Sequence, residues 1–237
     1  MLLYFRFGNK NVCFRKAAIA ILGAAAPMTV ASWDTTCQGV ALVRAYADFV
    51  VRALGLHNLN RGRPSNAVNI LYSARRASVQ WPERAFCDSA HSYFICEKLE
   101  HLQKRKLGRM VRNDNQTLNA LRTLETEHFA NGAVIKVRDV DFSTLSFEEQ
   151  IAMDVTTDIM IGPHGAGLMH NIFMPDRAAL IELFVDGSSA NRHFHNLAFW
   201  AGHSYTGEAQ SNPIKTARLV ELTRKHIKKL DLSHAKW

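Results

Sequence analysis

From residue 67 onward, short apolar runs alternate with helix patterns, and this alternation constrains the fold more than any other feature. The apolar runs at 67–72, 133–137, 158–162 and 179–185 have the length and composition of buried strands. Patterns with helical spacing lie at 117–129, 146–155, 165–173, 191–201 and 216–230. Strands that alternate with helices form parallel sheets built from βαβ units. The sequence therefore predicts an α/β domain with a Rossmann-like parallel sheet.

The first sixty residues have a different character. A helix pattern over 41–54 ends at Gly55, and a polar, turn-rich stretch follows at 58–66. The apolar run at 17–26 is shorter than the ~20 residues that span a bilayer. We interpret it as a core element rather than a signal peptide. The expected division is a segment at 1–60 and one domain at 61–237.

The net charge of +8 favours anionic partners. Residues 215–237 carry seven basic and two acidic side chains, and therefore contribute +5 of that total. No aromatic residues interleave with this basic tail, so a solvated helix face is favoured over a nucleic-acid arm. The four cysteines form no Cys-x-x-Cys pair, which argues against a zinc ribbon and leaves their pairing open.

A glycine-rich turn follows the strand at 158–162 and precedes a helix pattern. Its glycines let a ligand approach the backbone closely, and the amides of the next helix N-terminus favour a phosphate. The spacing matches neither the Walker pattern nor the dinucleotide fingerprint. A tight turn without a ligand is the alternative. The residues of this turn are His164, Gly165, Ala166, Gly167 and Leu168.

Charged residues occur near the carboxyl ends of two predicted strands. Arg75 and Arg76 follow the strand at 67–72, Arg84 comes soon after, and arginine suits a diphosphate because of its forked hydrogen bonding. Glu182 lies within the apolar run 179–185, where a carboxylate is costly unless it is paired. It is a candidate for ribose binding. The alternative is a structural ion pair with an arginine, either Arg177 or Arg192.

Two patterns raise the question of a metal ion. Asp139 and Asp141 form a D-x-D, which holds a divalent ion in metal-dependent sugar transferases but also occurs often by chance. His193 and His195 stand two residues apart at a predicted helix start, so they face different directions and make a poor ligand pair. No metal site is expected.

Four motifs in a fixed order resemble glycosyltransferase family 61, over residues 67–205. This family includes plant β-1,2-xylosyltransferases and EGF-domain-specific O-linked N-acetylglucosamine transferases. Residues 176–182 and His203-Ser-Tyr205 are most similar to the second group. The motifs are Ser146-Phe-Glu-Glu-Gln150, Ile161-Gly-Pro-His-Gly-Ala-Gly-Leu168, Phe173-Met-Pro175 and Ile181-Glu-Leu183.

The resemblance implies a GT-B enzyme of two Rossmann-like halves, of which this chain would supply the C-terminal, nucleotide-binding half. It implies inverting, metal-independent transfer of a sugar such as GlcNAc or xylose from a UDP-sugar to a hydroxyl of a glycoprotein or polysaccharide, without a cofactor, in the lumen of the ER or Golgi. By this likeness, residues 164–168 with Arg75 and Arg84 would hold the diphosphate, and Glu182 the ribose. The base is not identified.

Other features depart from the family or qualify these expectations. Cysteine stands at position 87, where many members have asparagine, and His170 replaces a threonine or asparagine. Residues 1–60 resemble the segment between the halves, so a facing N-terminal half is expected elsewhere. A lumenal location would make Asn115 a candidate N-glycosylation site. The alternatives are a metal-dependent transferase that uses Asp139 and Asp141, and an inactive nucleotide-binding fragment.

Overall fold

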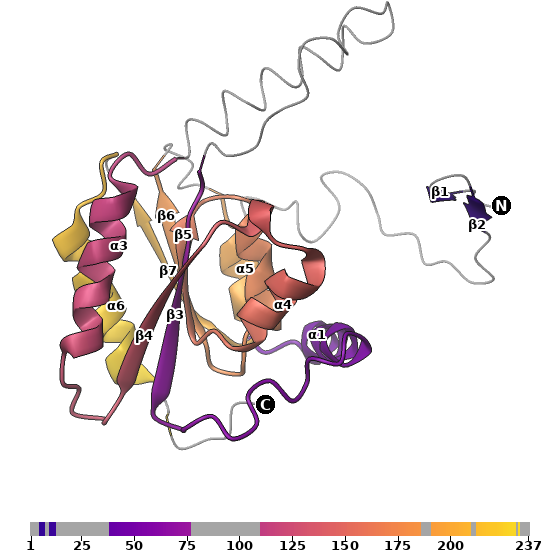
Figure 1. Cartoon of the computed structure of the whole chain (residues 1–237), viewed down its shortest axis with the longest axis horizontal. Coiled ribbons are helices and arrows are strands. Elements are labelled where there is room, and N and C mark those ends of the chain that lie inside the picture. The colour runs from indigo at the N-terminus through magenta and orange to yellow at the C-terminus, as the bar shows by residue number, and fades with distance from the viewer. Residues whose placement is uncertain are drawn as a thin grey trace, which may run out of the picture.

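The computed structural model describes residues 5–7, 10–12, 38–76, 110–185, 191–209, 212–230 and 232. Its centre is a five-stranded sheet in which every neighbouring pair of strands is parallel (Figure 1). This confirms the predicted Rossmann-like α/β class. The strands are β3 (Ala67–Ser73), β4 (Val134–Val140), β5 (Ile159–Pro163), β6 (Ala179–Phe184) and β7 (Ser204–Ala209). A separate antiparallel pair joins β1 (Phe5–Phe7) and β2 (Lys10–Val12).

The strand order β4-β3-β5-β6-β7 places the first strand of the sheet between the second and the third. Tyr72 of β3 pairs with Asp139 of β4 on one side and with Ile161 of β5 on the other. The chain therefore changes direction across the sheet at β3. In open parallel sheets, ligands bind outside the carboxyl ends of the strands at such a switch point. Here that point lies beyond the ends of β3 and β5.

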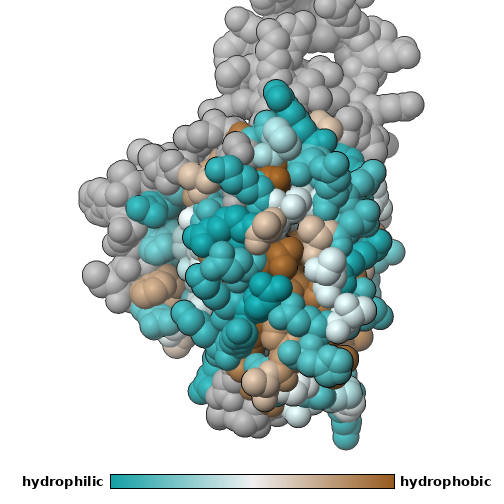
Figure 2. Space-filling view, turned by 90° about the vertical axis from the view of Figure 1, so that its left-hand side faces the viewer, coloured by the Kyte–Doolittle hydropathy of each residue, from teal (hydrophilic) through white to brown (hydrophobic). Residues whose placement is uncertain are grey.

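Helices cover both faces of the sheet (Figure 1). One face carries α3 (Asp114–Arg122) and α6 (Thr216–Lys229), and its outer surface is mainly hydrophilic (Figure 2). The other face carries α4 (Phe147–Val155), α5 (His193–Trp200) and the 3-10 helix η6 (Ala166–Phe173). The sheet is therefore buried on both faces, which explains why its central strands are continuously apolar.

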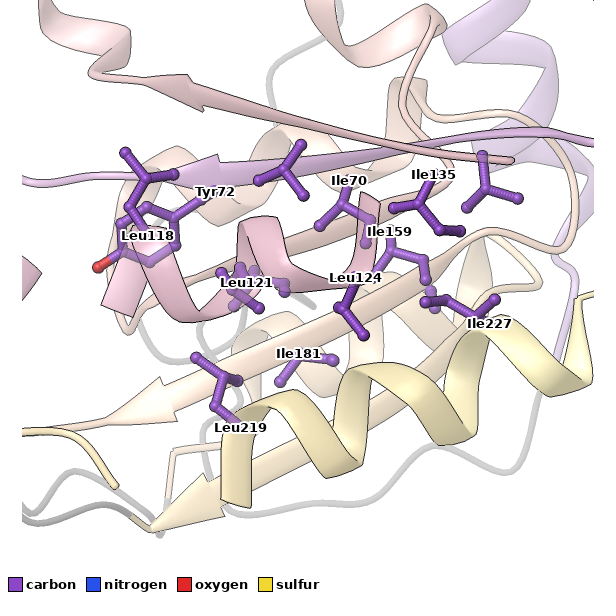
Figure 3. Packing of buried hydrophobic residues seen from close by; sticks show 14 of the residues in the cluster. Ile70, Tyr72, Leu118, Leu121, Leu124, Ile135, Ile159, Ile181, Leu219 and Ile227 are labelled. Atoms are coloured by element: carbon purple, nitrogen blue, oxygen red, sulfur yellow. The ribbon is translucent and has the colours of Figure 1, made fainter. Parts of the chain in front are cut away.

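Alternate residues of the strands pack on opposite faces, as the two-residue period of a strand requires. Ile70 and Ile181 point toward α3 and α6, where they pack in one cluster with Leu121 and Leu219 (Figure 3). Leu71 and Met160 point the other way, into a second cluster that includes Phe194 of α5. The core is thus divided into two layers by the sheet.

The predicted elements agree with the structure at most positions. The capping box is confirmed, because Ser146 Oγ accepts from the Glu149 amide and the Glu149 carboxylate accepts from the Ser146 amide. The helix predicted at 117–129 is shorter and earlier. It comprises α3 and a 3-10 turn, η4 (Thr123–Thr126), after which Glu125 Oε1 accepts from the Val137 amide. Strand β4 extends three residues beyond its predicted end, and η5 (Phe142–Thr144) follows it.

Helix α1 (Ala41–Ala53) confirms the helix pattern at 41–54. Within that pattern, Leu42 and Phe49 lie on a face that is exposed to solvent, at 78% and 69%. The opposite face packs inward, with Ala47 and Val51 against α4 and η6. The reason is Arg44, whose guanidinium donates to the carbonyls of residues 172 and 174 and pairs with Asp176. These bonds determine which face of the helix meets the domain.

A buried ion pair fastens the segment before β3 to the sheet. The guanidinium of Arg63 contacts the carboxylate of Asp158, which also accepts from the Asn69 amide. The same guanidinium donates to the carbonyls of Thr156 and Ala67. Both side chains of the pair are nearly inaccessible, at 11% and 5% exposed. Among the residues that the structure describes, no helix has the length and hydropathy to cross a membrane.

Candidate functional site

The carboxyl ends of β3 and β5 approach each other closely at the switch point. Gly162 of β5 permits this approach, because a Cβ there would lie 3.1 Å from the Ser73 Cβ and 3.1 Å from Leu168 Cδ2. A side chain at this position would push the two strand ends and η6 apart. The loop after β3 and the glycine-rich turn after β5 are therefore held side by side.

Arg75, from the loop after β3, lies against Gly165 of the turn. A Cβ at Gly165 would lie 2.7 Å from Cζ of Arg75, so only glycine leaves room for the guanidinium in this position. The backbone of Gly165 is extended, and the requirement for glycine is the space taken by Arg75 rather than an unusual φ. The structure thus brings together two of the residues that the sequence singles out. A forked cationic donor lies directly over the turn.

Gly167 has a different role from the one its spacing suggests. A Cβ there would point into the protein, 3.3 Å from Phe142 Cδ2 and 3.6 Å from Ser73 Oγ. Packing against Phe142 therefore explains this glycine without a ligand. Ala166 is exposed and Leu168 is buried, so η6 begins at the protein surface. The first amides of such a helix have no partner within it.

Glu182 is fully buried and is held by two donors. Its Oε1 lies 2.5 Å from Nδ1 of His164, and its Oε2 accepts from the Tyr205 hydroxyl at 2.7 Å. Tyr205 comes from β7, and burial together with the Glu182 carboxylate raises its pKa. The sequence suggests an arginine as the structural partner of Glu182. The partners found here are a histidine of the turn and a tyrosine of the last strand.

The two carboxylates of the D-x-D have partners within the protein. Asp139 is inside β4 and pairs with Arg76 at 2.8 Å, and the same guanidinium pairs with Asp114. Asp141 accepts from the amides of Arg76 and Ser143 and caps η5. Arg76 is therefore part of an ion-pair network beside β3, whereas its neighbour Arg75 reaches the turn.

The histidines at the start of α5 do not converge on one point. Nδ1 of His195 lies 3.0 Å from Asn196 Oδ1, and its ring meets the Tyr205 ring edge-on. Nε2 of His193 is buried and has no hydrogen-bond partner among the residues that the structure describes. The described part of the chain contains no group of three or more His, Cys, Asp or Glu residues that could hold a metal ion.

A second carboxylate–histidine pair connects η6 with α4. Nδ1 of His170 is 2.7 Å from Oδ2 of Asp154, and its ring stacks on Phe142 at 4.7 Å. Burial raises the pKa of Asp154 to about 7, although the hydrogen bond with His170 opposes the rise. Phe142 thus stacks on His170 of this pair and also lies next to Gly167.

The raised pKa of Asp154 predicts a specific pH dependence of stability. Because the folded state binds this proton more tightly than the unfolded state, the contribution is full below the unfolded pKa of about 4 and is lost as the pH rises to about 7. Relative to Asp154→Asn, the wild type should therefore lose free energy of unfolding between pH 4.5 and pH 7.5, measured by urea unfolding. Parallel pH profiles for the two proteins would contradict this.

Some expected features lie outside the described residues. Arg84, all four cysteines and the apolar run 17–26 are outside them. Asn115 is exposed on the first turn of α3, while Thr117 of the same sequon is buried and donates to the Asn113 carbonyl. The glycosylation of Asn115 remains a prediction.

Sequence patterns do not single out two residues near the site. Tyr205 is recognisable only as part of a motif, because β7 is a polar edge strand without a clear apolar pattern. Phe142 is buried in a short 3-10 turn and lies beside Gly167 and His170 of η6. No local pattern signals these contacts.

Comparisons with known proteins identify the family to which the chain belongs. The family model described as Glycosyltransferase 61 matches residues 36–181, which include β3, the glycine-rich turn and the first half of β6. Three curated relatives carry the name EGF domain-specific O-linked N-acetylglucosamine transferase. The Gallus gallus protein is 28% identical over 186 residues, covering 75% of this chain and 27% of the relative.

The other two relatives give similar figures. The Bos taurus protein is 27% identical over 216 residues, covering 88% of this chain and 32% of the relative. The Drosophila melanogaster protein is 33% identical over 182 residues, covering 74% and 26%. The chain therefore spans about a quarter to a third of the length of these relatives. With more than half of its residues matched by the family model, the chain belongs to the glycosyltransferase 61 family.

Proposed function

We propose that this chain provides the nucleotide-binding region of an inverting, metal-independent glycosyltransferase that uses a UDP-sugar. The diphosphate of the donor would bind beyond the carboxyl ends of β3 and β5. The transferred sugar would be GlcNAc or xylose, and the acceptor a hydroxyl of a glycoprotein or polysaccharide. The family match and the relatives named as N-acetylglucosamine transferases support the class of reaction.

The observation that carries this proposal is the placement of Arg75 over Gly165 at the switch point of the sheet. Three independent features coincide there: the switch point that the strand order creates, a cation with a forked donor group, and the start of η6. Each of them favours a phosphate group. The net charge of +8 favours an anionic ligand as well.

In the proposed mechanism, this arrangement stabilises the diphosphate as it leaves the donor sugar. In an inverting transfer, a base removes the proton of the acceptor hydroxyl, whose oxygen attacks the anomeric carbon of the donor. The bond from that carbon to the β-phosphate oxygen breaks, and negative charge develops on the diphosphate. Arg75 and the first amides of η6 would stabilise this charge where it forms. The base is not assigned to any residue here.

Metal independence is proposed because the D-x-D carboxylates are already engaged. Asp139 neutralises Arg76, and Asp141 caps η5. To hold a divalent ion, these side chains would have to give up several hydrogen bonds and leave Arg76 without one of its two carboxylates. Charge stabilisation by Arg75 and helix amides serves the same purpose as a metal ion on the diphosphate.

Titration calorimetry of the chain with UDP tests the proposal. UDP should bind, uridine should bind much more weakly because it lacks the diphosphate, and EDTA or manganese should leave the UDP affinity unchanged. The double variant Asp139→Asn, Asp141→Asn should retain the UDP affinity. A manganese-dependent affinity that this variant loses would favour the metal-dependent alternative.

Transfer itself is proposed to need a second half that faces this site. In a GT-B enzyme the acceptor binds between two Rossmann-like halves, and their closure orients it and excludes water. The relatives are three to four times as long as the matched region. We propose that such an enzyme acts in the lumen of the secretory pathway, and that the chain by itself binds UDP without transferring sugar.

A further inference from the structure

The buried Glu182 has a geometry that suits an indirect role. The side chain is 0% exposed, and each of its two oxygens has its own donor, Nδ1 of His164 and the hydroxyl of Tyr205. A ligand would reach this carboxylate only by displacing protein atoms that cover it. The resemblance suggests that this residue contacts the ribose. Such a contact would require the loss of a hydrogen bond between Glu182 and either His164 or Tyr205.

The His164 side chain is 5% exposed, whereas that of Glu182 is 0% exposed, and the neighbours of His164 hold its ring in one orientation. Its ring packs at 5.2 Å from the Phe194 ring and 5.8 Å from the Phe184 ring, between α5 and the end of β6. Its amide donates to the Leu183 carbonyl, so the backbone is fixed as well. Because Nδ1 faces Glu182, a carboxylate there selects the ring form with a proton on Nδ1. The nitrogen left for a ligand is Nε2.

The position of His164 connects this pair to the donor site. His164 is the first residue of the glycine-rich turn, and the next residue, Gly165, is the one over which Arg75 lies. Glu182 itself is on β6, one strand further from the switch point. A carboxylate behind a histidine fixes the tautomer and the direction of the ring, as it does behind histidines that bind metals.

We propose that Glu182 is a positioning residue that acts on the donor through His164, whose Nε2 contacts the diphosphate. This inference rests on the proposed function and assigns different tasks to its residues: Arg75 and His164 touch the diphosphate, and Glu182 does not touch the ligand. In this proposal Glu182 does not bind the ribose.

A double-mutant cycle distinguishes the two roles of Glu182. His164→Gln and Glu182→Gln should each weaken UDP binding about tenfold, as expected when a charge-assisted hydrogen bond is lost. If Glu182 acts through His164, the double variant should bind UDP no more weakly than His164→Gln alone. Glu182→Gln should also weaken 2′-deoxyuridine diphosphate by the same factor as UDP.

Tyr205→Phe is the matched control, because it removes the other donor of Glu182 and leaves the contact with His164 intact. Its UDP affinity should stay within about twofold of the wild type, since only one hydrogen bond remote from the ligand is lost. Circular dichroism and thermal unfolding of all the variants report whether the fold is kept.

Nitrogen-15 spectra of the histidine rings provide a second test, in which the ring is observed in the wild-type protein. His164, assigned from the signals missing in His164→Gln, should have a protonated Nδ1 in the free wild-type protein, and its Nε2 should shift when UDP is added. Additive losses in the cycle, a smaller loss for the deoxy nucleotide, or an unprotonated Nδ1 would overturn the role of Glu182. A wild-type protein that does not bind UDP would instead overturn the proposed function.

Discussion

Replacing Arg63 with methionine should lower the free energy of unfolding by about 3–5 kcal/mol, the range for removing one partner of a buried ion pair. Asp158 would keep its charge at 5% exposure and lose its cation. The carbonyls of Thr156 and Ala67 would lose a donor as well. Methionine retains most of the length of the side chain, so the loss would reflect the missing charge and hydrogen bonds rather than a cavity.

Arg52→Met is the control for this variant. Arg52 pairs with Asp48 four residues earlier on α1, and the two side chains are 63% and 41% exposed. Exposed pairs of this kind contribute little to stability. Urea unfolding of both variants measures the difference. If Arg63→Met costs no more than Arg52→Met, the segment before β3 is not fastened to the sheet by this ion pair.

Replacing Gly165 with alanine should weaken UDP binding by roughly tenfold to a hundredfold, because the hydrogen bonds of a cation to the diphosphate contribute about 1.5–3 kcal/mol. The added Cβ would occupy the position of the Arg75 guanidinium and displace it. Since the end of a flexible side chain can move, the free energy of unfolding should change by only about 1 kcal/mol or less. Calorimetric titration and urea unfolding measure the two effects.

Gly167→Ala separates this effect from a general disturbance of the turn. Its Cβ would press on Phe142, which has to give way by a few tenths of an ångström, and it would not meet Arg75. UDP affinity should change little in this variant. Arg75→Met should reproduce the loss seen in Gly165→Ala. Equal losses in both glycine variants, or full affinity in Arg75→Met, would show that Arg75 is not the group that binds the diphosphate.

The parts of the fold that depend on local pattern are predictable from the sequence. The apolar runs that become β5 and β6 are fully buried strands, and the run that becomes β3 is mostly buried. Such strands are recognisable as nearly continuous hydrophobic segments. The capping box fixes the start of α4 through contacts only three residues apart. The glycine-rich turn is recognisable for the same reason, since a strand, a turn and a helix follow each other directly.

The parts that depend on contacts between distant residues are not predictable in this way. The exposed apolar face of α1 carries the stronger pattern, but Arg44 determines its orientation through carbonyls about 130 residues away. Strand β7 is polar because it lies at the edge of the sheet. The pairing of Glu182 with His164 and Tyr205 exists only once β5, β6 and β7 are side by side.

The most direct test of the central claim is a map of the backbone amides that respond to UDP in the nitrogen-15-labelled chain. The account predicts that the largest shifts occur in the turn from His164 to Leu168 and at Arg75, with small shifts at Asp139 and Asp141. It also predicts the same pattern in the presence of EDTA. Saturable binding whose largest shifts lie at the opposite, amino-terminal edge of the sheet, or no shifts at all, would contradict the claim that the diphosphate binds at the ends of β3 and β5.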